Sequence, residues 1–281
     1  MAYRIAVDPD TTGSEAQAEW GIERLDVDAY LRRLEYTGSL DPTAETLQAL
    51  HRAHLASIPF ENLNILLGRG ISLELEDIQA KLVDSRRGGY CFEQNLLFAA
   101  ALERLGFNVT RLAARVQPEK PGPRTHMCLV VEAGGERWLA DTGFGTTLLE
   151  ALPLRDGAIS QQGKWTYRLD VDGDGVWFLR SQTPEGWADE YAFTLEPQRQ
   201  VDYVVFNHYT STYPSSPFVN QLVALRKTPE AQYALRGRSF TISAPGERFD
   251  TRTVGDDELA SILEETFGIV LSAEEVVRLS G

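Results

Sequence analysis

The chain has 281 residues, and its 43% hydrophobic content is ordinary for a soluble globular protein of about two domains. Its formal net charge of −14 at pH 7 argues against a general nucleic-acid binder and against attraction to anionic membranes. There is no run of 18 apolar residues, and residues 1–4 lead into acidic sequence instead of a signal-peptide core. We therefore expect a cytoplasmic protein whose two cysteines are free thiols.

The first hundred residues follow a helical pattern. Residues 28–34 predict an amphipathic helix, and Asp41 and Pro42 supply a cap and a first-turn proline for a second helix that continues to about residue 55. Residues 58–63 interrupt the pattern, and residues 78–82 resume it. This region is therefore predicted to be a helical bundle.

The segment from residue 87 to residue 95 is the most informative part of the sequence. Cys91 follows Gly88 and Gly89 and precedes the apolar residues 96–102, so the pattern predicts a helix with a thiol in its first turn. A helix N-terminus carries partial positive charge, which favours the reactive thiolate. A buried structural cysteine is the alternative. Two consecutive glycines favour the functional interpretation, because they suit backbone that turns sharply or approaches a ligand.

After Gly106 the pattern changes from helical to alternating, which predicts short antiparallel strands in a small barrel. The expected strands cover residues 109–116, 126–131, 137–140, 166–171 and 176–180. A mixed C-terminal region follows, with strands at residues 222–225 and 239–242 and helices at residues 256–267 and 272–279.

Four histidines could accept a proton from Cys91. His51 and His54 lie three residues apart on a predicted helix, and a structural role is favoured over a metal pair that lacks further ligands. His208 lies in a polar segment that we predict to be a loop, and it remains a reserve candidate. His126 begins a predicted strand and is the first candidate.

A predicted hairpin brings His126 toward an acidic residue. If Gly134 and Gly135 form a two-residue turn, residue 133 pairs with 136, 128 with 141 and 126 with 143. His126, Cys128 and Asp141 then share one face of the sheet, and Asp141 can reach the imidazole. A three-residue turn would direct Asp141 to the other face. Cys128 lacks a helix-start environment, so we interpret it as buried packing.

Cys91, His126 and Asp141 are therefore candidates for nucleophilic catalysis. Cys91 would attack, His126 would take or hold its proton, and Asp141 would orient the imidazole and stabilise its cation. Spacing alone does not exclude an ordinary polar pair between His126 and Asp141 at a strand edge.

Five segments of the sequence resemble the arylamine N-acetyltransferase family: residues 59–63, 87–95, 125–127, 141–145 and 215–218. The likeness covers most of the chain and thins after about residue 230. Thr142 departs from the pattern, in which Val is more frequent.

This resemblance implies an α+β fold of three parts: an N-terminal helical bundle (1–106), a central antiparallel β-barrel (107–209) and a C-terminal α/β lid (210–281). The first two parts would be arranged as in papain-like cysteine proteases. It also implies Cys91, His126 and Asp141 as the catalytic triad. Acetyl-CoA, a co-substrate, would acetylate Cys91, and an arylamine, hydrazine or N-hydroxyarylamine would then take the acetyl group by ping-pong kinetics, as in xenobiotic metabolism.

Further site residues are expected from the same resemblance. Phe60 would line the acceptor pocket unless it is simply a core aromatic, and the other expected substrate contacts are Tyr90, Thr125, Gly143, Phe144 and Phe218. The expected CoA contacts are Gly122, Arg124 and Gly145. Glu61 is expected to pair with Arg87 and brace the glycine turn. We expect no metal or prosthetic group, and a monomer or homodimer.

Three alternatives remain. An amide synthase of the same family, which releases or cyclises a polyketide, would use the same three residues without acetyl-CoA. A papain-like peptidase or transglutaminase would need an open cleft, which a C-terminal lid would obstruct. A noncatalytic binding module would not need all three reactive residues.

Overall fold

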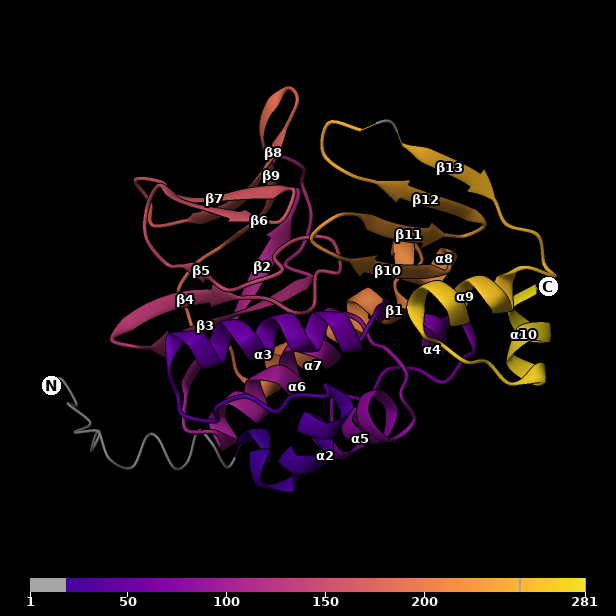
Figure 1. Ribbon diagram of the computed structural model, residues 1–281, viewed down its shortest axis with the longest axis horizontal. Coiled ribbons are helices and arrows are strands. Elements are labelled where there is room, and N and C mark those ends of the chain that lie inside the picture. Colours follow the sequence, from indigo (N-terminus) through magenta and orange to yellow (C-terminus); the bar gives the residue numbers. More distant parts are fainter. Residues whose placement is uncertain (1–18, 248, 281) are drawn as a thin grey trace, which may run out of the picture.

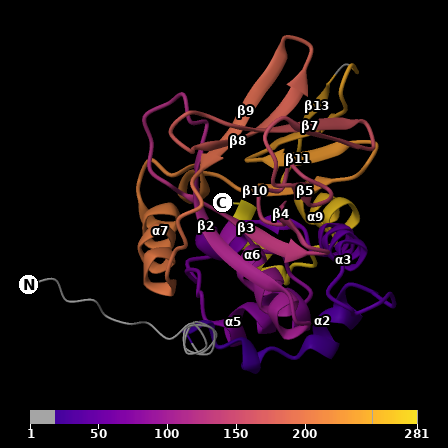
Figure 2. The same cartoon turned by 90° about the vertical axis from the view of Figure 1, so that its left-hand side faces the viewer.

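The computed structural model describes residues 19–247 and 249–280, so the expectation about a signal peptide, which rests on the first residues, lies outside the described part. The described chain has an α+β fold in which most helices lie below two antiparallel sheets (Figures 1 and 2). Within the described residues, no helix has the length and apolar character that a membrane span requires.

The N-terminal part is a helical bundle, as predicted. Its helices are η1 (Ile22–Arg24), α2 (Val27–Arg33), α3 (Ala44–Ser57), α4 (Leu63–Leu66), α5 (Leu75–Gln79), the π-helical turn η2 (Ala80–Asp84) and α6 (Cys91–Arg104). The predicted start of α3 was two residues early, because Thr43 and not Asp41 is its N-cap. Every residue of α6 from Cys91 to Leu102 is buried, so this helix forms the centre of the molecule.

Eight strands form a nearly closed barrel. The strands are β2 (Asn108–Val116), β3 (His126–Ala133), β4 (Glu136–Ala140), β5 (Leu152–Pro153), β6 (Ala158–Gln162), β7 (Trp165–Val171), β8 (Trp177–Thr183) and β9 (Gly186–Phe193). Their order is β5-β4-β3-β2-β9-β8-β7-β6, and the two edge strands β5 and β6 contact each other. Strands β5, β6 and β9 were not among the predicted strands.

The hairpin of β3 and β4 has the predicted register. Ala133 pairs with Glu136, and the turn residues Gly134 and Gly135 have φ angles of 62° and 80°, a combination that L side chains adopt poorly. Alternate residues of β3 face two different cores. Met127, Leu129 and Val131 pack with the helices, whereas Cys128 packs inside the barrel. The interpretation of Cys128 as buried packing is confirmed.

The C-terminal part contains α7 (Gln200–Thr212), α8 (Pro217–Asn220), β10 (Val223–Lys227), β11 (Gln232–Arg236), β12 (Ser239–Ser243), β13 (Asp250–Thr253), α9 (Leu259–Phe267) and α10 (Ala273–Ser280). Its sheet has the order β1-β10-β11-β12-β13, so its first strand, β1 (Phe60–Glu61), comes from the N-terminal bundle. The predicted loop around His208 is wrong, since this residue lies in α7. Helix α7 also crosses the expected boundary at residue 209, and the three ranges remain a prediction.

Candidate active site

Cys91 is the first residue of α6, and hydrogen bonds to β1 hold the backbone before it. The Gly89 N–H donates to the Pro59 carbonyl (3.3 Å), and the Glu61 N–H donates to the Gly89 carbonyl (3.0 Å). A Cβ atom on Gly88 would lie 2.2 Å from the Pro59 carbonyl oxygen. Glycine is therefore required here, because the turn passes too close to the neighbouring backbone for any side chain.

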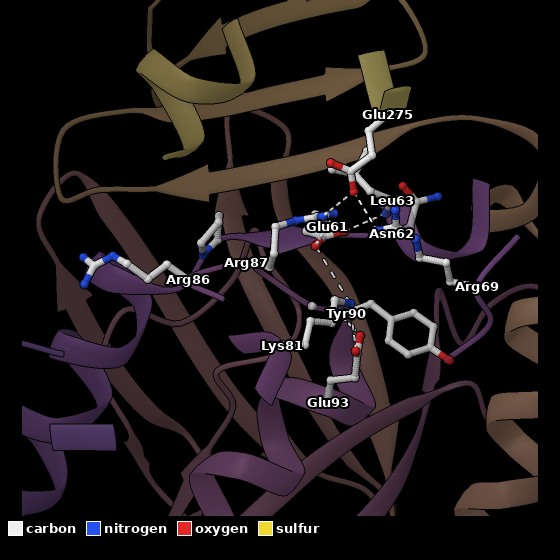
Figure 3. Close-up of polar contacts among 12 residues, drawn as sticks. Glu61, Asn62, Leu63, Arg69, Lys81, Arg86, Arg87, Tyr90, Glu93 and Glu275 are labelled. Carbon is white, nitrogen blue, oxygen red and sulfur yellow. Dashed lines mark hydrogen bonds and ion pairs between the residues drawn. The ribbon is translucent and has the colours of Figure 1, made fainter. Parts of the chain in front are cut away.

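A buried network of charged side chains surrounds this turn (Figure 3). Arg87 donates to Glu61 (3.3 Å), as expected, and also to Glu275 of α10 (3.2 Å). Lys81 donates to Glu93 (2.8 Å), whose other carboxylate oxygen accepts the backbone N–H at the N-cap of α6 (3.1 Å). The turn that carries the thiol is therefore fixed both to its own helix and to the C-terminal helix.

His126 and Asp141 meet as the hairpin register predicts. Nε2 of His126 lies 2.7 Å from Oδ2 of Asp141, and both side chains are buried. Because a carboxylate only accepts, Nε2 carries the proton of the neutral imidazole and Nδ1 keeps its lone pair. The other carboxylate oxygen accepts from the Asn95 amide (3.0 Å) and the Gly143 N–H (2.9 Å). Burial raises the pKa of Asp141, but His126 and these hydrogen bonds lower it more, so its pKa is below the usual value.

The Cys91 thiol lines the same pocket as His126, but it is directed at a backbone oxygen. Its Sγ donates to the Thr125 carbonyl at 3.6 Å. Burial raises the pKa of the thiol, and the nearby charge of Asp141 raises it further. Burial thus acts on the thiol in the opposite direction to the effect expected from the helix start. The resting thiol is protonated.

His51 contributes to the site through backbone contacts. Its Nδ1 donates to the Leu149 carbonyl (3.0 Å), and its Nε2 accepts the Asp141 N–H (3.1 Å). Both ring nitrogens of His54 are hydrogen-bonded to buried side chains. Among the described residues, no three His, Cys, Asp or Glu side chains are grouped as metal ligands. The favoured structural role of both histidines is confirmed.

A pocket of about 350 Å³ opens above the thiol. It brings together five of the six expected substrate contacts, Phe60, Thr125, Gly143, Phe144 and Phe218, with Cys91 and His126. The Phe144 ring lies edge-on to the His126 imidazole, with 5.0 Å between ring centroids. Aromatic rings therefore form the walls around the reactive groups, as an aromatic substrate requires.

The other expected contacts lie outside this lining. Tyr90 is fully buried, and its ring packs edge-on against Phe218, which does line the pocket. Arg124 pairs with Glu196 at 3.7 Å, and neither it nor Gly122 lines the pocket, although the intervening Pro123 does.

Gly145, with a φ of 82°, also lies outside the lining and supports the pocket from behind. A Cβ atom there would lie 2.9 Å from Phe60 and from Leu225, two residues that do line it. Gly145 therefore allows the barrel loop and the C-terminal sheet to close on each other.

Three residues of the site were missed by sequence reasoning. Asn95 donates to both the Met127 carbonyl (2.6 Å) and Asp141, and so joins α6 to the barrel. The sequence could have indicated Asn95 as a site residue, because Asn95 lies four residues after Cys91 and so on the next turn of the same helix. His51 and Arg236 had no such signal, because they reach the site from α3 and β11 through tertiary folding alone.

A cysteine at the start of a central helix, next to a histidine and an aspartate on an adjoining barrel, defines the papain-like class of architecture. The chain matches the family model described as N-acetyltransferase over residues 43–276. An enzyme named arylamine N-acetyltransferase / N-hydroxyarylamine O-acetyltransferase, from Salmonella typhimurium, is 39% identical over 247 residues, which cover 86% of this chain and 88% of the relative.

Comparison with solved structures gives the same family as the sequence comparisons. The arylamine N-acetyltransferase of Nocardia farcinica superposes with a TM-score of 0.87 and 39% identity, covering 94% of this chain and 96% of that one. The Mycobacterium marinum enzyme in complex with CoA has a TM-score of 0.84 and 35% identity, covering 91% and 98%. The chain therefore belongs to the arylamine N-acetyltransferase family.

Proposed function

We propose that this protein transfers an acetyl group from acetyl-CoA to the nitrogen of arylamines, hydrazines or N-hydroxyarylamines. The observation that carries the proposal is the hydrogen bond of 2.7 Å between His126 and Asp141, in the same pocket as Cys91. Family membership and the CoA complex of a relative support acetyl-CoA as the donor. Cys91, His126 and Asp141 are the proposed catalytic residues.

The first half-reaction would acetylate Cys91. The thiol turns from the Thr125 carbonyl toward Nδ1 of His126, which takes its proton while Asp141 stabilises the imidazolium. Sulfur then attacks the thioester carbonyl, the bond between the acetyl carbon and CoA sulfur breaks, and CoA leaves with the proton from His126. Because burial holds the resting thiol protonated, this transfer to His126 is what generates the nucleophile.

The second half-reaction would transfer the acetyl group to nitrogen. The amine attacks the thioester carbonyl on Cys91, His126 removes the amine proton, and the cysteine sulfur departs as the leaving group. Arylamines are weakly basic and mostly neutral at pH 7, so their lone pair is available, whereas alkyl amines arrive protonated. The ring of the acceptor would pack against Phe60, Phe144 and Phe218.

The remaining expected contacts keep supporting roles in this proposal. Tyr90 would hold Phe218 in position, and Gly122 and Arg124 would offer backbone or charge to the CoA arm. Gly145 would serve the CoA arm from behind the wall formed by Phe60 and Leu225. We also propose a cytoplasmic monomer or homodimer that binds neither nucleic acid nor membranes, consistent with the net charge of −14.

Intact-mass measurement after mixing with acetyl-CoA tests the proposal directly. We expect one acetyl adduct, which an arylamine discharges as the N-acetyl product. Cys91→Ser should abolish the adduct, and Cys128→Ala should retain it, since Cys128 is packed inside the barrel. An adduct that persists in Cys91→Ser would overturn the assignment of the nucleophile.

The same measurement separates the acetyltransferase from an amide synthase of this family. An amide synthase would take up the acyl chain of a polyketide and leave Cys91 unmodified by acetyl-CoA. The pocket of about 350 Å³ and its aromatic lining favour a small aromatic acceptor. A peptidase is disfavoured because α8 and β10 close the pocket on one side through Phe218 and Leu225.

A further inference from the structure

The pocket above Cys91 is almost without charge. Its lining includes no aspartate or glutamate, and among the described residues only Arg236 contributes a side chain with a permanent charge. The chain as a whole carries a net charge of −14, which repels anionic substrates at long range. A single cation in a pocket lining without acidic side chains is therefore well placed to select for negative charge.

Arg236 belongs to the lining of this pocket. It is the last residue of β11 and pairs with Val223 of β10, which also lines the pocket. Arg236 is exposed, and its guanidinium forms no ion pair or side-chain hydrogen bond with any described residue.

By contrast, three other arginines form ion pairs with acidic side chains. Arg238 pairs with Asp256 at 2.5 Å, Arg252 with Glu258 at 3.1 Å, and Arg124 with Glu196 at 3.7 Å. The guanidinium of Arg236 thus keeps all its donors available to a ligand. Its planar, forked donors suit an oxyanion such as a phosphate or a carboxylate.

We propose that Arg236 is an oxyanion-recognition residue of this pocket, which binds a phosphate or carboxylate group of a substrate whose reacting atom lies at Cys91. The inference rests on the proposed function and adds a specificity-determining contact to it. The oxyanion has two possible sources: a phosphate of CoA, or a carboxylate on the aromatic ring of the acceptor.

The donor arm of the test compares acetyl-CoA with p-nitrophenyl acetate, a neutral acetyl donor, using the neutral acceptor 4-ethoxyaniline. If the oxyanion is a phosphate, Arg236→Gln should raise the KM for acetyl-CoA about tenfold and leave kcat/KM for p-nitrophenyl acetate unchanged. Added salt should raise the KM of the wild type for acetyl-CoA more than that of the variant.

The acceptor arm uses p-nitrophenyl acetate as donor and compares 4-aminobenzoate with its ethyl ester. If the oxyanion is a carboxylate, Arg236→Gln should lower kcat/KM about tenfold for the acid and leave the ester unchanged. Arg236→Lys should recover part of the loss in whichever arm responds, because the charge remains while the forked geometry is lost.

Arg252→Gln is the matched control, since it removes the same charge from the same sheet outside the pocket. The inference is overturned if Arg236→Gln has the kinetic constants of the wild type in both arms. It is also overturned if the variant loses the same kcat/KM with charged substrates as with neutral ones. A wild type that transfers no acetyl group to any acceptor would instead refute the proposed function, so the two failures are distinguishable.

Discussion

Nε2 of His126 lies 2.7 Å from Oδ2 of Asp141, and both side chains are buried. The pair fixes the tautomer of the imidazole and leaves Nδ1 as the only nitrogen that can accept a proton in the pocket. A thiol whose pKa is raised by burial depends on that acceptor. In the proposed mechanism, the reactivity of Cys91 is thus set by a hydrogen bond that Cys91 does not itself form.

Asp141→Asn should preserve the fold and slow acetylation of Cys91 by about 10³-fold or more, because the imidazole loses its orienting charge. The rate is measured as the burst of p-nitrophenol from p-nitrophenyl acetate in a stopped-flow instrument. Circular dichroism provides the control for folding. An unchanged burst rate would contradict the proposed role of Asp141.

Gly143→Ala should reduce activity more than stability. A Cβ atom there would lie 2.6 Å from the Cys91 carbonyl oxygen and 2.6 Å from the Asn95 amide nitrogen, so the barrel loop must move away from α6. We expect a loss of about 1–3 kcal/mol in the free energy of unfolding and a greater loss in kcat/KM. Gly173→Ala is the control, because no atom lies within 4 Å of its added Cβ. Equal behaviour of the two variants would refute the steric argument.

Glu275→Gln should lower the free energy of unfolding by about 2 kcal/mol at pH 7, because buried Glu275 accepts from Arg69 (2.6 Å) and Arg87 (3.2 Å). Burial raises the pKa of Glu275. The hydrogen bonds from the Ser272 N–H and Arg69 lower it by more, so the pKa is below the usual value.

A carboxylate with a lowered pKa stabilises the fold above its unfolded pKa of about 4.3, and this contribution is lost as the pH falls through the folded pKa. The two proteins should therefore converge in acid. Glu274→Gln, on the exposed face of α10, is the control and should have no effect. A difference between wild type and Glu275→Gln that persists unchanged at pH 3 would argue against the ion pair.

The buried histidines should make the protein sensitive to mild acid. Burial lowers the pKa of His51 to about 4 and of His54 to about 3. His54 is neutral between the Tyr30 hydroxyl (2.8 Å) and the Gln94 carbonyl oxygen (2.7 Å). In the unfolded chain each histidine takes up a proton near pH 6.5, so the free energy of unfolding falls as the pH decreases from there, through the folded pKa values.

Each histidine contributes a slope of about 1.4 kcal/mol per pH unit in this window. Urea denaturation between pH 7 and pH 5 measures the slope. His54→Gln should reduce it, whatever its effect on absolute stability, and His208→Gln on exposed α7 should leave it unchanged. The same slope in His54→Gln as in the wild type would rule out the proposed titration.

The sequence predicted the parts of the site that depend on local geometry. The turn of Gly134 and Gly135 set the register that joins His126 to Asp141, and the helix beginning at Cys91 follows from its apolar continuation. Both depend on residues close in sequence, where strand alternation and helix periodicity apply directly.

Features that depend on distant contacts were not predictable. Helix α7 was missed because Val201, Val204 and Val205 are exposed, so its apolar residues do not mark a buried face. The raised pKa of the Cys91 thiol depends on how completely the folded protein excludes water, which no local pattern encodes. The contact of Glu275 with Arg87 joins the last helix to the first third of the chain and had no sequence signal.

The pairing of β1 with β10 affects the order of events during biosynthesis. Helix α6 is synthesised before the C-terminal sheet. The turn before α6 is hydrogen-bonded to β1, and β10, the strand that pairs with β1, emerges from the ribosome much later. Glu275, in α10, emerges later than this sheet. The turn that carries Cys91 can therefore reach its final arrangement only after the strands of the C-terminal sheet and α10 have been synthesised.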